Sequence, residues 1–563
     1  MPTAVFGSVV LNDPCRTITA QRMEEVLPVV EFAEAEARFG RYVIIMLAYE
    51  AAPVFDPALR THAQNDFPLA WAASFAGTSE EESNGSFVSG PWTPQVSKDE
   101  YDSAVARIRE LIAAGDTYQV NYSFPMTSSF NGDAYSWYRD LCVAQGAKYC
   151  AYLDLGRYRV LSLSPELFFE RAGDHVTTRP MKGTVRRGRW PAEDEELACW
   201  LQNSTKDKAE NIMIVDLLRN DLGKVSVTGS VHVSSLFQTE RFETVWQMTS
   251  TVEATLGEGT SLVELISALF PCGSVTGAPK IRTMKIIREL EPFPRGAYTG
   301  AIGLIRPGGD CVFNVAIRTV VIDTESGVAT FGVGGGVTID STAEKEYEEC
   351  LVKSRFLRSK AVEFELFESI LLEDGEFFLL DRHLERLRRS AAYFGFATDF
   401  ATDFEKRLGS WKVKVTLSKD GRIETEMSPI TKLTEPVRVA LATDPVDSSD
   451  PFLFHKTTRR EHFSHGSNLV FWNERGEITE SSIANVVVRI GDQLFTPPVS
   501  SGLLAGTFRE QLLAEGKIRE RVITIEELKN APEFFLINSV RRWMQAELVV
   551  EQDLRAGASK LLQ

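Results

Sequence analysis

The sequence has few cysteines and no long apolar run. Its seven cysteines among 563 residues form no CxxC pair and have no histidine at zinc spacing, so neither a disulfide scaffold nor a structural zinc site is expected. No run reaches 18 apolar residues, so no transmembrane helix is predicted. The first residues also lack the basic segment of a secretory leader. We therefore expect a cytoplasmic enzyme or binding protein.

The chain also has no excess of basic residues. It carries 61 Lys and Arg against 78 Asp and Glu, a net charge of −17. Because a protein that neutralises phosphates needs clustered cations, this balance argues against a nucleic-acid partner. A hydrophobic content of 44% is typical of a soluble globular protein with no membrane partner.

The apolar patterns divide the chain into three parts. Residues 1–96 show weakly patterned strands and loops. Residues 97–362 alternate strand-like runs with amphipathic helices, which predicts an α+β domain on a large sheet. Residues 363–563 begin a new pattern with their own strand and helix, and are long enough for a smaller α+β domain. We expect domain boundaries near 96 and 362.

Two pairs of acidic residues lie three apart in predicted helices. Asp207 and Glu210 fall in a helix over about 205–218, and Glu346 and Glu349 fall in EKEYEECLVKSR. Residues three apart project from the same side of a helix. Acids from two such helices, if brought together, would form the oxygen-rich ligand set that Mg²⁺ prefers. The alternative is that both pairs are solvated helix faces.

Two glycine-containing loops precede helices. FGVGGGVTIDS leads into the second acidic helix, and PCGSVTGAPK leads into IRTMKIIREL. Backbone N–H groups in such loops can bind a carboxylate or a phosphate. Neither loop has the order GxxxxGK[ST], so a nucleotide P-loop is not supported.

Taken in order, the motifs of the first part resemble those of the chorismate-utilising enzymes. They are SPELFFE at 164–170, RPMKGTVRRG at 179–188, KAENIMIVDLLRNDLG at 208–223, PCGSVTGAPK at 271–280, RGAYTGAIG at 295–303, FNVAIRT at 313–319 and GVGGGVTIDSTAEKEYEEC at 332–350. The resemblance covers about 97–360. It implies a domain that binds chorismate and Mg²⁺.

The middle residue of RPMKGT separates the reactions of that family. Members that form anthranilate carry alanine there, whereas those that form aminodeoxychorismate carry lysine, here Lys182. A desolvated amine can lose its proton and attack the substrate ring. The resemblance implies a covalent intermediate at Lys182, with Glu166 as the general acid or base. By itself, Lys182 could equally be a surface lysine.

The resemblance also assigns the metal ligands. Glu210 and Glu349 are implied as direct Mg²⁺ ligands, with Asp207 and Glu346 holding waters. Asp207 departs from the usual glutamate and is one methylene shorter.

Substrate contacts follow from the same motifs. Tyr298 and Arg318 resemble the groups that bind the side-chain carboxylate of the substrate, while Thr276 and the backbone around Gly336 resemble the clamp for the ring carboxylate. Gln247 stands where relatives often place a histidine. Glutamine cannot carry a proton near neutral pH, so an acid role falls on Glu166 or a water.

The last part of the chain offers a lysine, a glutamate and hydroxyls in LFHKTTRREHF, GEITESSIANVVV and SGLLAGTFREQLL. Lys456 could serve as a Schiff-base lysine and Glu480 as the carboxylate opposite a cofactor ring nitrogen. The hydroxyls of Ser481, Ser482 and Thr507 would suit a phosphate. Residue type alone favours a structural role for all of them.

The order of these motifs resembles the fold-type IV pyridoxal phosphate enzymes over about 364–555. That group includes D-amino-acid and branched-chain aminotransferases and aminodeoxychorismate lyase. The resemblance implies Lys456 as the Schiff-base lysine, Glu480 at the pyridine nitrogen, and Arg386 with Thr507 on the phosphate. Further cofactor contacts are implied at Ser482, Asn485, Asn538 and Ser539.

Both resemblances on one chain indicate a short pathway. Chorismate and ammonia would give 4-amino-4-deoxychorismate, from which the second half would remove pyruvate to leave 4-aminobenzoate, a folate precursor. The closest rival is an anthranilate- or isochorismate-forming half beside an amino-acid aminotransferase, and Lys182 argues against anthranilate. In a third hypothesis either half is a binding or assembly module that has lost catalysis.

The sequence motifs also lead to expectations about the partners of the chain. We find no glutaminase motif, so ammonia is expected to come free or from a separate amidotransferase subunit. No tryptophan site is recognisable in residues 1–95. Because fold-type IV enzymes commonly build their sites at a dimer interface, we expect a homodimer through residues 363–563.

Overall fold

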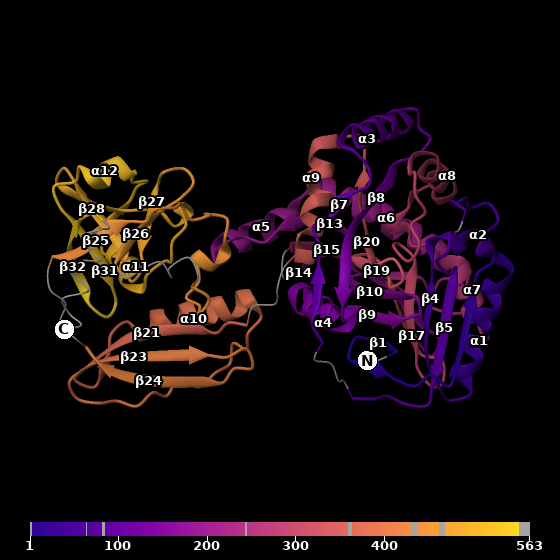
Figure 1. Cartoon of the computed structure of the whole chain (residues 1–563), viewed down its shortest axis with the longest axis horizontal. Coiled ribbons are helices and arrows are strands. Elements are labelled where there is room, and N and C mark those ends of the chain that lie inside the picture. The colour runs from indigo at the N-terminus through magenta and orange to yellow at the C-terminus, as the bar shows by residue number, and fades with distance from the viewer. Residues whose placement is uncertain are drawn as a thin grey trace. The chain divides into compact units, whose positions relative to one another are not determined.

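The computed structural model describes residues 3–63, 65–80, 85–242, 245–358, 363–430, 436–460 and 468–550. The chain forms two compact units (Figure 1). One contains Met1–Arg187 and Leu197–Ala361, and the other contains Gly188–Glu196 and Val362–Gln563. The domain boundary expected near 362 lies outside the described residues. The apolar pattern along the chain did not indicate that residues 188–196 belong to the second unit.

Two antiparallel sheets form the first unit. The strand order of the first sheet is β16-β8-β20-β19-β10-β9-β1-β2, with β6 and β7 also paired to β8. Its strands are β1 (Ala4–Phe6), β2 (Val9–Leu11), β6 (Phe87–Ser89), β7 (Thr93–Pro94), β8 (Gln119–Gly132), β9 (Tyr149–Asp154), β10 (Tyr158–Ser164), β16 (Gly277–Ala278), β19 (Thr319–Asp323) and β20 (Val328–Val337).

The second sheet has the order β13-β15-β12-β11-β18-β17-β4-β5-β3, with β14 paired to β15. Its strands are β3 (Arg16–Ala20), β4 (Tyr42–Leu47), β5 (Ala70–Phe75), β11 (Leu167–Ala172), β12 (His175–Arg179), β13 (Met181–Arg186), β14 (His232–Arg241), β15 (Val245–Thr255), β17 (Ala301–Ile305) and β18 (Cys311–Val315).

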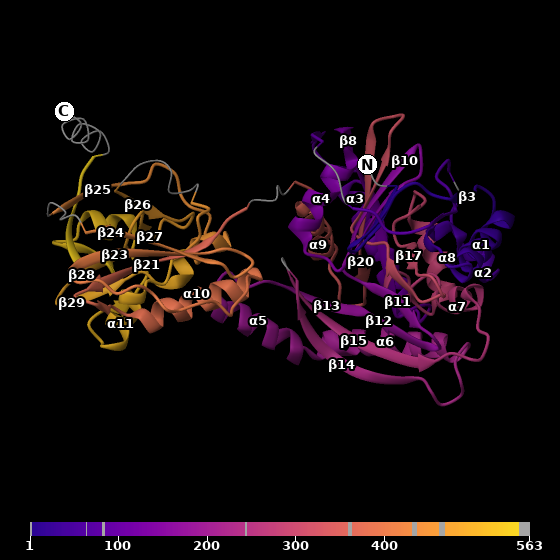
Figure 2. The ribbon, with the colours of Figure 1, turned by 90° about the horizontal axis from the view of Figure 1, so that it is seen from below.

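Helices cover the outer faces of both sheets. Those of the first unit, with the connecting helix α5, are α1 (Val26–Arg38), α2 (Ala52–Phe55), α3 (Lys98–Ala113), α4 (Ala134–Gln145), α5 (Pro191–Asn203), α6 (Thr205–Gly223), α7 (Leu262–Leu269), α8 (Lys280–Leu290) and α9 (Ala343–Ser354). Helix α6 lies along β13 and β15 (Figure 2). Helix α3 begins with a capping box between Ser97 and Glu100.

Alternation along the strands separates three apolar clusters. On β4, Ile44 and Met46 face a cluster shared with β1, β9 and β17, between the two sheets. Val43 and Ile45 face the opposite side, where α1, α6 and α7 pack. Helices α3, α4 and α9 cover the far side of the first sheet. The unit is therefore a sheet sandwich between two helical layers.

Residues 1–95 are more regular than the sequence pattern indicated. Helix α1 was missed because Pro28 in its first turn and two neighbouring valines reduce the local helix signal. Its buried stripe of Val26, Val29, Val30 and Ala33 packs on the second sheet. This part also supplies β4 and β5, both buried, so tertiary packing decides its structure.

The second unit combines a small and a larger sheet. The small one has the order β22-β21-β23-β24 and the larger one β27-β26-β25-β32-β31-β28-β29-β30. The strands are β21 (Leu366–Glu373), β22 (Glu376–Phe377), β23 (Ser410–Leu417), β24 (Ile423–Pro429), β25 (Val437–Leu441), β26 (Leu469–Trp472), β27 (Ile478–Ser481), β28 (Asn485–Ile490), β29 (Gln493–Thr496), β30 (Arg519–Glu520), β31 (Phe534–Asn538) and β32 (Arg542–Leu548). Its helices are α10 (Leu380–Phe394), α11 (Thr507–Ala514) and α12 (Ile525–Lys529). The predicted α+β class is confirmed.

All seven cysteines are free, as their spacing predicted. Over the ranges described, no helix combines the length and apolar character needed to cross a membrane.

Candidate active sites

Lys182 lies on β13 with only 17% of its side chain exposed, so it is not a surface lysine. Its Nζ lies 3.2 Å from Oε2 of Glu210 on α6. Gln247 on β15 holds the strand beside it: its Nε2 donates to the Gly183 carbonyl at 2.9 Å, and its Oε1 accepts from the Thr184 hydroxyl at 2.8 Å. The residue that replaces the family's histidine thus fixes the backbone that carries Lys182.

Gly336 on β20 allows this lysine to approach the glycine loop. A Cβ at Gly336 would lie 2.4 Å from Lys182 Nζ and 2.8 Å from Nε2 of Gln119, distances at which atoms overlap. Gln119 is fully buried, and neither polar atom of its amide has a partner among the described groups. A buried amide without partners is costly unless a ligand satisfies it. No motif in the sequence indicated Gln119 as a residue of the site.

Glu166 is a buried carboxyl close to Lys182. Burial raises the pKa of Glu166 to about 7, while the Ser274 hydroxyl, the Met181 backbone and the Lys182 charge act in the opposite direction. Its Oε1 has no hydrogen-bond partner in the described structure. A carboxyl with a pKa near 7 can both give and take a proton at neutral pH.

The four predicted metal ligands each have a partner. Glu346 accepts from the Ser341 hydroxyl at 2.7 Å, Glu349 pairs with Lys353 at 2.8 Å, and Asp207 accepts from the hydroxyl of Ser204. Lys353 and, more weakly, Lys182 lower the pKa of Glu349, and the charge of Lys182 also opposes the upward shift in the pKa of Glu346, so this charge reaches α9 as well as α6.

Whether these carboxylates hold Mg²⁺ stays a prediction. Within the residues that the structure describes, no three Asp, Glu, His or Cys side chains meet closely enough to hold a metal ion. Burial, with a further contribution from Glu349, raises the pKa of Glu346. An oxygen-only ligand set of like charges fits a hard divalent cation, which would relieve that repulsion. Glu210 and Glu349 would exchange their lysine partners for it.

The predicted substrate-binding residues lie on three connected segments. The fully buried Thr276 donates its hydroxyl to the Cys272 and Gly273 carbonyls at 3.2 and 3.3 Å, and its own carbonyl accepts from the Asn121 N–H at 2.8 Å. Asn121 is the register partner of Gly336 on the neighbouring strand. Thr276 and Gly336 are thereby joined through β8.

Tyr298 is buried and Arg318 is half-buried. Burial raises the pKa of Tyr298 to about 12, and its ring lies against Gly332, where a Cβ would overlap it. Arg318 has φ +49° and donates to the side-chain oxygen of Gln145 on α4. Burial lowers the pKa of Arg318 to about 10. Arg318 is therefore a desolvated cation, of the kind that binds a carboxylate strongly.

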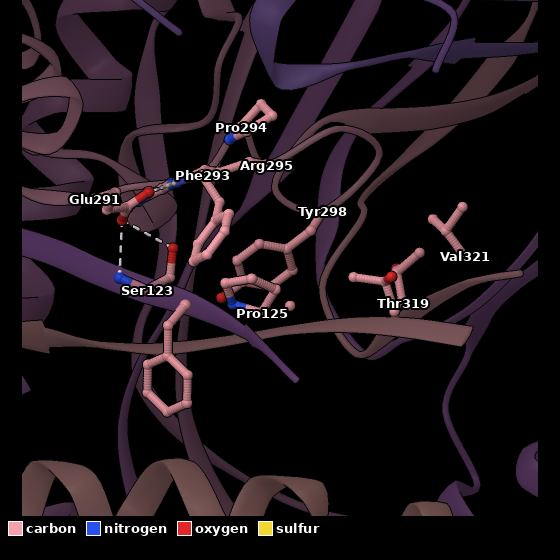
Figure 3. A pocket seen from close by; sticks show the side chains of 12 residues that line it. Ser123, Pro125, Glu291, Phe293, Pro294, Arg295, Tyr298, Thr319 and Val321 are labelled. Atoms are coloured by element: carbon pink, nitrogen blue, oxygen red, sulfur yellow. Dashed lines mark hydrogen bonds and ion pairs between the residues drawn. The ribbon is translucent and has the colours of Figure 1, made fainter. Parts of the chain in front are cut away.

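A cavity of about 40 Å³ lies beside Tyr298, with Ser123, Glu291 and Arg295 in its wall (Figure 3). The guanidinium of Arg295 donates all five of its N–H groups. Two go to Glu291 at 2.6 and 2.9 Å, and the others go to the Asn121 carbonyl, the Val275 carbonyl and the Thr299 hydroxyl at 2.6, 2.9 and 3.2 Å.

The second candidate site surrounds Lys456, which follows a short 3₁₀ turn over Pro451–Leu453. Its Nζ lies 4.8 Å from the centre of the Phe367 ring. Burial, assisted by the charge of Arg386, lowers the pKa of Lys456 to about 7, although Glu368 and Glu480 act in the other direction. A neutral amine at this pH is what a Schiff-base lysine requires.

Glu368 on β21 connects the predicted phosphate residues, and the sequence motifs did not indicate it. Arg386 donates to both of its oxygens at 2.8 and 2.6 Å, and His383 Nδ1 lies 2.7 Å from Oε2. His383 Nε2 in turn lies 3.1 Å from the Thr507 hydroxyl at the start of α11. The spacing of His383 and Arg386, three apart on α10, was the one available signal.

Glu480 on β27, the predicted partner of a ring nitrogen, is buried. Burial raises the pKa of Glu480 to about 7, while the nearby charge of Arg460 lowers it. One oxygen accepts from the Leu504 N–H at 3.1 Å. Asn485 beside it donates to the Leu504 carbonyl at 2.8 Å, so both residues hold the loop before α11.

The remaining predicted cofactor residues have backbone partners. The Ser482 hydroxyl accepts from the Asn468 N–H at 3.2 Å, and the Ser539 hydroxyl lies 3.4 Å from the Ser369 carbonyl. The Asn538 side chain accepts from the Val540 and Arg541 N–H groups at 3.0 and 2.8 Å. These contacts order the loop after β31 that was expected to face a phosphate.

These sites define a chain with two enzyme-like parts, a large chorismate-binding domain followed by a smaller domain of the class IV aminotransferase type. Residues 58–359 match the family model of the chorismate binding enzymes, and residues 365–549 match that of class IV aminotransferases. The chain belongs to the chorismate binding enzyme family. The class IV match implies pyridoxal phosphate, and chorismate-binding enzymes use Mg²⁺.

Two curated relatives are similar to about half of this chain. The chain is 41% identical over 282 residues to aminodeoxychorismate synthase component 1 of Bacillus subtilis and 38% identical over 296 residues to that of Escherichia coli K12. These matches cover 50% and 53% of this chain, and 58% and 64% of the relatives, so the chain spans less than two thirds of their length.

Anthranilate synthases are also similar. Component 1 from Streptomyces coelicolor is 40% identical over 265 residues, covering 47% of this chain and 52% of that one. The crystal structure of component I from Streptococcus pneumoniae TIGR4 superposes with a TM-score of 0.56 at 25% identity, covering 63% of this chain and 92% of that chain. Overall similarity thus leaves the reaction to be decided by the site.

Replacing Arg295 should lower the thermal stability of the first unit selectively. Arg295→Leu leaves the Glu291 carboxylate buried without its partner, which typically costs about 3–5 kcal/mol. We expect a clearly lower transition for the first unit in scanning calorimetry. Arg306→Leu removes an exposed arginine from the same unit and serves as the matched control. Equal transitions for the two variants would contradict this role of Arg295.

The uptake of pyridoxal phosphate should follow the titration of Lys456. Only the neutral amine reacts, so the rate of uptake by cofactor-free protein should rise with pH and level off above about pH 7, the pKa of Lys456. Stopped-flow absorbance measures this rate. Lys456→Ala should abolish the absorbance change, and Lys412→Ala, which alters an exposed lysine on β23, should leave it intact. A rate that keeps rising to pH 10 would show an ordinary lysine.

Proposed function

We propose that the chain converts chorismate and ammonia into 4-amino-4-deoxychorismate and then releases pyruvate from it to give 4-aminobenzoate. The observation that carries the first half is the position of Lys182, mostly buried, paired with Glu210 and lying against Gly336. The printed names of the B. subtilis and E. coli relatives support the same reaction.

In the first half, Lys182 acts as the nucleophile. Its amine attacks the substrate ring, and the 4-hydroxyl leaves as water with a proton that Glu166 supplies. Ammonia then adds at the carbon that lost the hydroxyl and the bond to Lys182 breaks. The pKa of Glu166, about 7, suits a group that gives a proton in one step and recovers it in the next.

Substrate binding would use the buried groups around this lysine. Arg318 and Tyr298 would bind the side-chain carboxylate, and Thr276 with the Gly336 backbone the ring carboxylate. The partnerless amide of Gln119, which lies against Gly336, would donate to the same ligand. Mg²⁺ would be held by Glu210 and Glu349 directly, with Asp207 and Glu346 through waters.

In the second half, Lys456 moves the proton. Pyridoxal phosphate, when bound, supplies the electron sink for this chemistry. Lys456 would take the α-proton, since its pKa of about 7 makes it a base at neutral pH. Glu480 would face the ring nitrogen. The phosphate would be held by Arg386, Thr507, Ser482 and Ser539.

The chief rival is an anthranilate-forming first half beside an amino-acid aminotransferase. The sequence identity to an anthranilate synthase relative, 40%, is similar to that of the aminodeoxychorismate synthase relatives, and this supports the rival. Lys182 favours aminodeoxychorismate, because the resemblance gives anthranilate-forming members an alanine there. A separate amidotransferase as the ammonia source, a homodimer through the second unit and a cytoplasmic location are parts of the same proposal.

A product assay tests both halves together. Purified protein with chorismate, Mg²⁺, an ammonium salt and pyridoxal phosphate should release 4-aminobenzoate and pyruvate in equal amounts. Lys182→Ala should abolish both products from chorismate while supplied 4-amino-4-deoxychorismate is still converted. Lys285→Ala, an exposed lysine on α8, is the control. Anthranilate as the main product, or an unchanged rate in Lys182→Ala, would refute the proposal.

Glu166→Gln separates proton transfer from binding. A glutamine keeps the shape but cannot exchange a proton, so we expect a loss of about 10²–10⁴-fold in kcat for the first half, typical of a general acid–base group. The conversion of supplied 4-amino-4-deoxychorismate should not change. A synthase rate within a few-fold of the unaltered protein would remove Glu166 from the mechanism.

A further inference from the structure

A segment far away in the sequence packs beside the loop that carries Lys456. Residues 188–196 follow β13, yet they belong to the second unit. Their internal contacts make the segment stiff. The Gly188 N–H donates to Asp194 at 2.8 Å, and a Cβ at Gly188 would overlap the backbone of Asp194. Glu193 accepts from the backbone and the guanidinium of Arg189 at 2.6 and 3.1 Å.

Trp190 packs against the residue two positions before Lys456. Its ring centre lies 5.1 Å from that of Phe454, and Trp190 adds to a buried cluster that includes Leu453, Phe454 and Phe471. Arg189 lies 5.6 Å above the Phe454 ring and donates to the Ser448 carbonyl at 3.1 Å. Phe454 is therefore covered on one side by this segment.

The next residue, His455, is held by the same arrangement. Its ring lies 4.3 Å from that of Tyr393 on α10, and its Nδ1 lies 2.9 Å from the Ser390 hydroxyl. Tyr393 also donates its hydroxyl to the Gly188 carbonyl at 2.7 Å. The segment thus contacts Phe454 directly and His455 through Tyr393.

We infer that residues 188–196 form a strap that positions the Lys456 loop, with Trp190 as the positioning residue. The C-terminal unit is then incomplete without a piece of chain that precedes it by some 170 residues. Lys456 is half-buried, and its side chain must meet a cofactor carbonyl in a fixed geometry, so an ordered Phe454–His455 backbone is a condition for that contact. This inference rests on the proposed function of the second unit.

The test uses the full chain with Trp190→Ala, Trp190→Phe and Trp200→Ala. Trp200 is 57% exposed on α5, the helix that begins directly after Trp190, and it lies outside the strap, so it is the matched control. Because one buried aromatic pair is removed, Trp190→Ala should bind pyridoxal phosphate about five- to tenfold more weakly in absorbance titrations. Amide hydrogen exchange at residues 454–456 should also become faster. Trp190→Phe should restore most of both, and Trp200→Ala should match the unaltered protein.

Two results are decisive and distinguishable. If Trp190→Ala matches Trp200→Ala in both cofactor affinity and exchange at 454–456, the strap does not position this loop and the inference fails. If the unaltered protein does not bind pyridoxal phosphate, the proposed function of the second unit fails instead. Hydrogen exchange then still decides the inference, because it reports the backbone without the cofactor.

Discussion

The first unit depends on one buried ion pair. Arg295 and Glu291 are each only 3% exposed, and the arginine uses its remaining donors on Asn121, Val275 and Thr299. Each of these is next to, or paired with, a residue of the candidate site: Asn121 with Gly336, Val275 with Thr276, and Thr299 with Tyr298. Breaking such a pair leaves an uncompensated charge in the interior. One guanidinium therefore fixes three segments of the candidate site, of which the one around Asn121 lies 174 residues away in the sequence.

The second unit uses a carboxylate for the same purpose. Arg386 and His383 hold the pKa of Glu368 well below its usual range despite its burial. The strand carrying Glu368 and the helix carrying Arg386 are thereby locked together, and His383 extends the connection to Thr507 on α11. The pKa of Lys456 is lowered because the effects of burial and of the Arg386 charge are together larger than the opposite effects of Glu368 and Glu480. The same few side chains thus hold these elements together and influence the pKa of Lys456.

The sequence predicted what local motifs encode. The two acidic pairs were predicted to lie on helices, and the structure places them on α6 and α9. Lys182 and Lys456 were identified by motif order, and the structure leaves both only partly exposed. Glu368, Gln119 and Arg295 were not predictable, because each acts through partners brought together only by tertiary packing. The strap at 188–196 was missed for the same reason: a boundary read along the chain cannot show a segment that packs with another unit.

Hydrogen-bond satisfaction distinguishes scaffold from site. Arg295 has every donor used, so it has none left for a ligand, and both oxygens of Glu368 already accept hydrogen bonds from its scaffold partners. Gln119 and Glu166 are equally buried but keep polar atoms without partners in the described structure. Burying such atoms costs free energy that folding does not recover. The groups that folding leaves unsatisfied beside Lys182 are therefore the ones that a bound ligand would satisfy, and this is the physical reason for placing the candidate site there.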